Sequence, residues 1–403
     1  MRLTLLALLP LSLLQFGCAG QEPAPTEGRA PAATRQIIKP DHFPKDRPYS
    51  FGVQAGDFLY LSGQLGRHIS TGVQPEGIDA QTRQAMENIG EVLKAGGMDY
   101  ANLVKCHVYL DTMDDYTGMN QVYGSFFSER VPARTTVEAV ALPQGAGVQI
   151  SCIGFRDLTR ISVVRPAEGT LPAPLGPYSA AVWAGDTLFL SGMGGQFPEG
   201  RRLPEPLGEQ VSQTLVNIKT TLEAAGLGFE DVVASNVYIT RPGEAGELAG
   251  AYAPAFPSSA PPRGLIVLPR LPGAIKAEIT FVATRPEEDR PGPSAADETE
   301  GVARSRSARG VLYTRTESAR EAGPGFEEQF RAVLGQLEST LRDAGLAPAD
   351  IVHVHVYMAD LADMDSMNRI FRETFPQHAP ARTTIQEMPG DGERVKASLV
   401  ATR

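Results

Sequence analysis

The chain has 403 residues, of which 42% are hydrophobic and 21% charged, the composition of an ordinary soluble globular protein with two to three domains. Its formal net charge of −10 argues against nucleic acid as a main partner, because nucleic-acid affinity depends largely on clustered Lys and Arg side chains that neutralise phosphates.

The first 18 residues, MRLTLLALLPLSLLQFGC, predict an export signal. A positive charge at Arg2 precedes an apolar run over residues 3–14, which is too short to span a bilayer. The ending in Gly17-Cys18 resembles a bacterial lipoprotein signal, although Gln15 departs from the aliphatic residue usual at its position. The resemblance implies that Cys18 is lipidated and that the mature protein lies at the periplasmic face of a bacterial membrane, which it touches only through this anchor. The alternative is a plain secretory signal and a soluble periplasmic or secreted protein.

Residues 19–40 open with a stretch rich in Pro, Ala and Gly that has no apolar periodicity, which predicts a flexible tether. The two remaining cysteines, Cys106 and Cys152, lie in strand-like runs and are too few for a disulfide framework. We expect them to pack as small buried hydrophobes, and a single bridge between them stays open.

One pattern recurs three times along the chain. EVLKAGGMDYANLVKCHVYL around Gly97 matches TTLEAAGLGFEDVVASNVYI around Gly226 and STLRDAGLAPADIVHVHVYM around Gly345, at offsets of 129 and 119 residues. The segments VPARTTVEAVALP, APPRGLIVLPRLP and APARTTIQEMP repeat at the same two offsets and align three arginines, Arg134, Arg263 and Arg382. Agreement at two separate anchors predicts three tandem units of domain size.

Changes of period give the order of elements within the second unit. Paired short strands come first, in YSAAVWAGDTLFLSG (178–192), as in YSFGVQAGDFLYLSG (49–63) of the first unit. Apolar residues then recur at helical spacing up to Gly226, which sits where a helix C′ residue belongs: Val211, Leu215, Ile218 and Leu222. A strand at 232–239, a second helix near 248–256 and a closing hairpin at 263–284 complete the order β-β-α-β-α-β-β.

This order predicts an α+β unit with helices on one face of a mixed sheet. In the last strand Ala277 and Ile279 alternate with Glu278 and Thr280, so the second face is enriched in polar residues and must pack against another unit. We therefore expect the three units to close on one another as an intrachain pseudo-trimer, with functional crevices between domains.

The expected domains are 41–157, 165–285 and a shortened third domain at 301–403. The segment DLTRISVVRPAEGT precedes the second domain, and residues 286–300, which are acidic and rich in Pro and Gly, form the linker to the third. In the third domain ARSRSARGVLYTRT (303–316) is the only candidate for the first two strands.

The motifs PYS, AGDxLYLSGQ, AAGL, NVYI and PAR-T-T-VE, in this order and three times over, resemble the RidA (formerly YjgF) family of reactive-intermediate deaminases. The resemblance covers residues 40–403 and implies a chorismate-mutase-like fold with sites between subunits. It also implies hydrolysis of enamines or imines such as 2-aminoacrylate to the 2-keto acid and ammonia, without metal or organic cofactor. The substrate would be a small carboxylate-bearing metabolite.

The chemistry accounts for the residue types that the family uses. A guanidinium grips a carboxylate with two parallel hydrogen bonds, so Arg134, Arg263 and Arg382 match the family's carboxylate-binding Arg. Hydrolysis also needs a group that transfers protons, and Glu278 matches the family's acidic residue. The equivalent positions are Gln149 and Lys396 in the other units, and neither side chain accepts a proton as a carboxylate does.

Other family positions are divided among the units. The site tyrosine is present as Tyr49 and Tyr178, the glycine backbone contact as Gly63 and Gly192, and the site asparagine as Asn120 and Asn368. The second unit has Ala249 in place of the asparagine, and the family's cysteine two residues after the Arg is replaced in every unit, by Thr136, Leu265 and Thr384.

No unit keeps the whole set, which suggests sites shared between units. If a hairpin turn lies near Pro272-Gly273, Glu278 pairs with about Leu268, roughly 17 Å along the strand from Arg263. This exceeds one small substrate. We therefore expect one unit's Arg to combine with a neighbour's Glu, so that at most one of three crevices is fully equipped.

Less specific interpretations apply to several of these residues. Each Arg could be structural, Lys396 is expected to be a solvated charge on a strand face, and Trp183 to lie in the core. His353 and His355 share a strand face, but without a third ligand we expect no metal site. The alternative to a deaminase is a non-catalytic protein that binds small carboxylates, or a structural pseudo-trimeric scaffold.

Overall fold

The computed structural model of the protein describes residues 35–287, 292 and 301–403. The predicted export signal, Cys18, residues 19–34 of the tether and most of the linker at 286–300 lie outside the described residues. In the part that is described, no helix is both long enough and apolar enough to cross a membrane.

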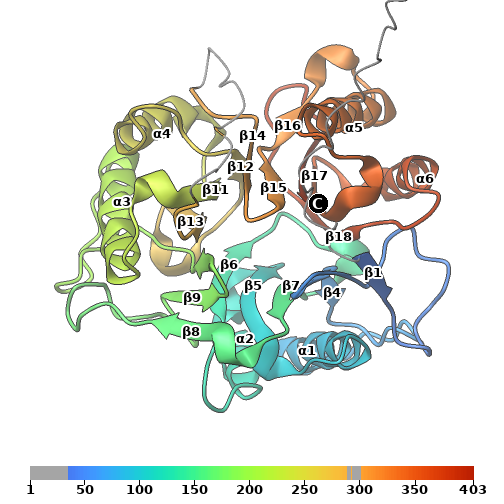
Figure 1. Ribbon diagram of the computed structural model, residues 1–403, viewed down its shortest axis with the longest axis horizontal. Coiled ribbons are helices and arrows are strands. Elements are labelled where there is room, and N and C mark those ends of the chain that lie inside the picture. Colours follow the sequence, from blue (N-terminus) through green and yellow to red (C-terminus); the bar gives the residue numbers. More distant parts are fainter. Residues whose placement is uncertain (1–34, 288–291, 293–300) are drawn as a thin grey trace, which may run out of the picture. The chain divides into compact units, whose positions relative to one another are not determined.

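Each repeat forms its own sheet, with two helices packed on one face (Figure 1). The first domain contains β1 (Arg35–Ile38), β2 (Gly52–Ala55), β3 (Phe58–Leu61), β4 (Gln64–Leu65), α1 (Ile78–Ala95), β5 (Leu103–Leu110), α2 (Tyr116–Gly124), β6 (Ala133–Glu138) and β7 (Val148–Phe155). The second contains β8 (Ile161–Val164), β9 (Ala181–Ala184), β10 (Thr187–Leu190), α3 (Leu207–Ala224), β11 (Val232–Ile239), α4 (Ala245–Tyr252), β12 (Arg263–Val267) and β13 (Ala277–Thr284). The third contains β14 (Ser305–Ala308), β15 (Val311–Thr314), β16 (Glu317–Ser318), α5 (Phe326–Asp343), β17 (Ile351–Met358), α6 (Met364–Thr374), β18 (Ala381–Gln386) and β19 (Val395–Thr402). The predicted α+β architecture of three tandem domains is confirmed.

The strand order corrects one element of the prediction. In the second sheet the order is β12-β11-β13-β10-β9-β8, with β11 parallel to β12 and antiparallel to β13. The closing hairpin predicted at 263–284 was therefore wrong, because the crossover through α4 places β12 on the far side of β11. Glu278 pairs with Tyr238 rather than with Leu268.

Some element boundaries also differ from the sequence-based expectation. Helix α4 begins at Ala245 and ends at Tyr252, before the predicted end at Phe256. Strand β8 lies inside the segment expected to join the first two domains, where it pairs with β9 at the edge of the second sheet. Strand β1 lies in the expected tether and pairs with β2.

The cores lie between the helices and the sheets. In the second domain the four periodic residues of α3 pack with Ala277, Ile279 and Phe281 of β13, and Trp183 is buried in the same cluster as predicted. Glu278 and Thr280 therefore face away from the helices, toward the other domains. Gly226 follows α3 with a φ of 73°, the left-handed conformation expected of a helix-ending glycine.

Cys106 and Cys152 lie directly opposite each other on β5 and β7 and form a disulfide. Both are also buried in the core of the first domain. The predicted burial is thus confirmed, and the bridge that the sequence left open is present.

The described residues belong to one compact unit, in which the three domains contact one another pairwise. One backbone hydrogen bond recurs at each interface, from the second residue after a short strand to the carbonyl oxygen of the repeated Arg of another domain. The three bonds are Gly192 N to Arg134 O (3.0 Å), Gly63 N to Arg382 O (3.0 Å) and Thr316 N to Arg263 O (3.3 Å). The central strands also meet in a shared apolar cluster that contains Tyr109, Tyr238 and Tyr357.

Candidate active site between the first and second domains

The backbone of Arg134 is held by the second domain. Arg134 is the second residue of β6, and its N–H donates to Ser191 Oγ at 2.8 Å. Ser191 in turn donates to the carbonyl oxygen of Ser179 at 2.6 Å. Together with the Gly192 N–H that donates to the Arg134 carbonyl, these bonds fix the base of the side chain at the interface.

The Arg134 guanidinium is buried among aromatic rings. Only 3% of the residue is exposed, and the guanidinium carbon lies 5.0 Å from the ring centre of Tyr123, 5.5 Å from that of Tyr178 and 5.8 Å from that of Tyr116. Within the described ranges it forms no ion pair; one nitrogen lies 3.4 Å from Tyr116 Oη. A buried cation among aromatic rings, with no carboxylate of the described residues in an ion pair with it, is a favourable place for a carboxylate ligand.

Glu278 lies beside Arg134 at the same interface. Its residue is 4% exposed, and its carboxylate packs so closely on Gly192 that a Cβ at position 192 would lie 1.8 Å from Oε1. Burial raises the pKa of Glu278 to about 8, although Lys105, Arg134 and the backbone N–H of Thr136 oppose the shift. A carboxyl group with this pKa can accept or release a proton near neutral pH.

Lys105 is a further member of the site that sequence reasoning missed. Its ammonium donates to Leu190 O (2.6 Å), Thr135 Oγ1 (2.8 Å) and Thr280 Oγ1 (2.9 Å), so it joins both domains below Glu278. Burial lowers the pKa of Lys105, and the neighbouring Glu278 raises it, which favours the ammonium form. The sequence did contain a signal for this residue, a lysine within the central strand LVKCHVYL. The other units have Ala234 and His353 at the equivalent position.

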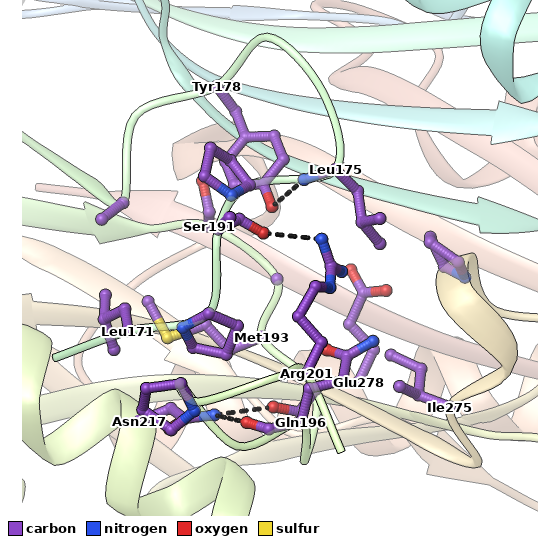
Figure 2. Close-up of a pocket in the computed structure, with 18 of the residues that line it drawn as sticks. Leu171, Leu175, Tyr178, Ser191, Met193, Gln196, Arg201, Asn217, Ile275 and Glu278 are labelled. Carbon is purple, nitrogen blue, oxygen red and sulfur yellow. Dashed lines mark hydrogen bonds between the residues drawn. The ribbon is translucent and has the colours of Figure 1, made fainter. Parts of the chain in front are cut away.

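A cavity of about 550 Å³ opens above these residues (Figure 2). The first domain contributes Tyr116, Arg134 and Thr136, and the second contributes the remaining lining residues, among them Tyr178, Gly192 and Glu278. Asn120 lies behind the lining: a Cβ at Gly176 would come within 2.7 Å of both Asn120 Oδ1 and Arg134 Nη2. One cavity thus adjoins an Arg, a Glu, a Tyr, a Gly and an Asn from the family set.

Arg263 and Glu278 do not share this cavity. The two residues lie on opposite sides of β11, because Arg263 pairs with Ser235 and Glu278 with Tyr238. The Arg that meets Glu278 belongs to the first domain.

The interface between the third and first domains holds a second, incomplete set of these residues. Arg382 donates to Asn368 Oδ1 at 2.8 Å, and its guanidinium lies 4.9 Å from the ring centre of Tyr49. Burial lowers the pKa of Arg382 to about 10. Gln149, which replaces the acid, donates to Thr384 O at 2.8 Å, and the pocket that includes Tyr49 and Gly63 measures only about 40 Å³.

The interface between the second and third domains has a buried ion pair at the position that corresponds to the acid. Lys396 Nζ lies 2.9 Å from Glu387 and 3.6 Å from Glu393, and it donates to Leu265 O at 2.9 Å. Lys396 is 9% exposed, so the expectation of a solvated charge was wrong. The residue occupies the register position of Glu278, opposite Tyr357, as the strand pattern predicted.

The histidines of the central strands are buried and close together. The ring centres of His353 and His355 are 4.3 Å apart, and those of His107 and His355 are 6.0 Å apart. Burial lowers the pKa of His355 to about 4 and that of His353 well below its usual range. Across the described ranges, no group of three His, Cys, Asp or Glu side chains is placed to hold a metal ion.

The segment before β9 was also missed as part of the site. The sequence placed a domain boundary at 157–170, yet Pro166, Ala167, Glu168 and Gly169 line the cavity, together with residues 171–175. Composition rich in Pro and Gly is shared by linkers and by loops that cover sites, so the sequence offered no signal that separates the two.

Comparison with known proteins places these observations in a family. The family model described as Endoribonuclease L-PSP matches residues 41–155, 169–285 and 314–389, more than half of the chain. A 2-iminobutanoate/2-iminopropanoate deaminase of Mus musculus is 41% identical over 110 residues, which are 27% of this chain and 82% of that protein. Protein DfrA of Myxococcus xanthus is 40% identical over 123 residues, 30% of this chain and 94% of that protein.

Among solved structures, RidA from Psychrobacter sp. PAMC 21119 is 37% identical and is similar to 30% of this chain and 98% of its own, with a TM-score of 0.29. Because the family model matches three times, each match corresponds to one domain of this chain. The chain therefore belongs to the RidA family of enamine and imine deaminases, as a tandem array of three family domains.

Proposed function

We propose that the protein hydrolyses 2-imino acids, or their enamine tautomers, to 2-keto acids and ammonia in the cavity between its first and second domains. The observation that carries this proposal is the juxtaposition in one cavity of Arg134, a buried cation without an ion pair among the described residues, and Glu278, a carboxyl group whose pKa is raised to about 8. A small imino acid offers one carboxylate and one electrophilic carbon, which match these two groups.

The proposed steps use only these side chains and water. Arg134 binds the substrate carboxylate. With an enamine, protonated Glu278 donates its proton to the β-carbon, which yields the iminium ion and leaves a carboxylate. The carboxylate then accepts a proton from the water that attacks the iminium carbon. Passing this proton to the nitrogen expels ammonia, and the hydroxyl proton returns to Glu278 as the keto acid forms.

A small carboxylate fits this chain better than the RNA that the family description suggests. The formal net charge is −10, whereas RNA binding requires clustered cations that track phosphates. The cavity is lined by two guanidinium groups, and the buried one, Arg134, is surrounded by three tyrosines, which suits one anionic group.

The test measures keto-acid release from imines generated in situ by oxidation of amino acids. We expect Glu278→Gln to lower kcat by about 100- to 10,000-fold, the usual contribution of a proton-transferring group. Arg134→Lys should raise KM by about tenfold or more, because an ammonium cannot reproduce the two-pronged grip on a carboxylate. Arg382→Lys, the matched change at the interface without an acid, should leave both constants within about twofold.

The result also separates the alternatives. If the wild-type protein does not accelerate hydrolysis, the proposed activity is wrong. Binding of 2-oxo acids that depends on Arg134 would then identify a carboxylate-binding protein, and absence of binding would leave a structural scaffold.

We further propose that the protein is exported and anchored through a lipid on Cys18, with a soluble periplasmic form as the alternative. Support comes from the apolar leader that ends in Gly17-Cys18 and from the Cys106–Cys152 disulfide, since disulfides persist in oxidising compartments. Cys18→Ala should abolish incorporation of labelled palmitate and move the protein from the membrane fraction to the soluble one. Unchanged fractionation in a bacterial host would refute the anchor.

A further inference from the structure

The cavity between the first and second domains is much larger than a three-carbon substrate requires. It measures about 550 Å³, within the range of about 300–1,000 Å³ typical of sites that bury drug-sized ligands. The pocket at the interface between the third and first domains, which is built from the same elements, measures about 40 Å³. The same elements thus enclose very different volumes at these two interfaces, so the size is not a property of the fold.

The two groups proposed to react lie at the inner end of this cavity. Arg134 and Glu278 are 3% and 4% exposed, whereas Leu171 and Met193 of the lining are half-buried. A substrate whose carboxylate is bound to Arg134 must therefore direct its side chain outward, along this lining.

Apolar side chains form much of the remaining lining, which also includes Glu168, Gln196 and Arg201. Figure 2 shows Leu171 and Met193 on one side and Leu175 and Ile275 on the other. Five prolines add to this surface: Pro166, Pro172, Pro174, Pro198 and Pro272.

Two sets of hydrogen bonds hold the loops of the lining. Asn217 donates to Gly194 O (3.0 Å) and Gln196 O (2.9 Å) in the loop that carries Met193. Arg201 donates to Ala173 O at 2.9 Å. The lining is thus held in place by hydrogen bonds between loops.

One pair of substitutions between repeats distinguishes the two linings. The pair Met193 and Ile279 of the second domain has the same register as the pair Gln64 and Ile150 of the first. Gly194 of the second domain therefore corresponds to Leu65 of the first, and Ile275 corresponds to Ala146. In the first domain the Leu65 side chain packs against the cluster that contains Ala146. In the second domain position 194 has no side chain, and a Cβ there would lie 2.6 Å from Ile275 Cδ1. The Ile275 side chain thus fills the space beside Gly194. Leu65 lines the small pocket at the interface between the third and first domains, whereas Gly194 adds no side chain to the lining of the large cavity.

We propose that this cavity selects 2-imino acids, or their enamine tautomers, that carry a bulky apolar side chain of the leucine or phenylalanine type, in preference to three-carbon substrates. The inference rests on the proposed function, since it names the substrate class of that same site. Burial of a side chain against the apolar lining favours such substrates by the hydrophobic effect.

The test compares imines generated in situ from L-alanine, L-leucine and L-phenylalanine. We expect the wild-type protein to show kcat/KM about tenfold or more higher for the two bulky imines, because each additional methylene group in an apolar pocket contributes roughly tenfold or more. The double variant Gly194→Leu/Ile275→Ala restores the pair that already packs in the first domain. It should lower kcat/KM for the bulky imines by about tenfold and change that for the alanine-derived imine by less than about threefold.

Ile275→Ala alone, which widens the cavity, is the control and should retain the bulky substrates. Wild-type preference for the alanine-derived imine, or an equal loss for all three imines in the double variant, would overturn the inference and leave the proposed function intact. Calorimetry with pyruvate and 4-methyl-2-oxopentanoate separates the remaining cases. Tighter binding of the longer acid without any hydrolysis would support the ligand class and refute the activity; no preference in either assay would refute the inference.

Discussion

Glu278 ionises next to two cations that come from the first domain. Lys105 lies on β5 and Arg134 on β6, while the hydroxyls of Tyr116, Tyr178 and Tyr238 also interact with the carboxylate. Where the acid is replaced by Gln149, the position of Lys105 is taken by His353, whose pKa is lowered so that it is neutral. Where Lys396 replaces the acid, the position is taken by Ala234. A positively charged side chain therefore stands at the position of Lys105 only where the neighbouring residue of the other domain is an acid. This correspondence assigns Lys105 a positioning role toward Glu278.

Lys105→Met should shift the pH profile of imine hydrolysis. The proposed cycle begins and ends with protonated Glu278, so wild-type kcat/KM should fall as pH rises through about 8, the raised pKa of this group. Loss of a cation that favours the charged form raises this pKa further, and the profile should move to higher pH by about one to three units. His353→Met, the matched change at the interface with Gln149, should leave the profile unmoved. A profile that is the same in Lys105→Met and the wild type would contradict the positioning role.

At the scale of elements, the disulfide fixes the two strands that carry the inner face of the first domain. Cys106 of β5 and Cys152 of β7 close a loop with a sequence separation of 46, which should stabilise the fold by about 2–4 kcal/mol. In urea unfolding, the free energy of unfolding of the variant Cys106→Ala/Cys152→Ala should be lower than that of the wild type by this amount. A reductant should lower the free energy of unfolding of the wild type by the same amount. The reductant should have no effect on the variant. Identical unfolding of the wild type with and without reductant would show that the bridge adds no stability.

The same strands illustrate how alternation determines the position of the site. Residues of β13 that face the helices are apolar, whereas Glu278 and Thr280 on the other face reach the first domain, where Thr280 accepts a hydrogen bond from Lys105. A one-residue shift in register would exchange these faces.

At the scale of the whole molecule, the three interfaces have diverged in what they bury. The interface between the second and third domains buries Lys396 against Glu387, and burial raises the pKa of Glu387 to about 7. Lys396→Met should destabilise the protein by about 3–5 kcal/mol at pH 8, because it leaves an uncompensated buried carboxylate.

The destabilisation should decrease as pH falls. The folded-state pKa of Glu387 is higher than its ordinary value, so folding takes up a proton and the protonated form carries no charge that needs compensation. Thermal unfolding of Lys396→Met against wild type at pH 8 and pH 5 measures this difference. Lys396→Met/Glu387→Gln should recover most of the loss at pH 8. A deficit that is independent of pH would show that packing, not charge, accounts for the effect.

The sequence by itself determined the local and repeated features of this protein. Matching motifs at two constant offsets fixed three tandem domains, helical spacing up to Gly226 fixed the buried face of α3, and alternation in β13 placed Glu278 on the face opposite to the core. These features follow from the geometry of single elements, in which the period alone determines the direction of each side chain.

Which elements contact one another is seen only in the tertiary structure. In the folded protein β11 lies between β12 and β13, and Cys106 is bonded to Cys152. Arg134 of the first domain lies next to Glu278 of the second, and residues of the segment 166–175 line the cavity. Each of these contacts joins residues far apart in the chain, and three similar domains offer several pairings with nearly the same local pattern. The choice among them depends on packing and charge at the interfaces, which periodicity does not record.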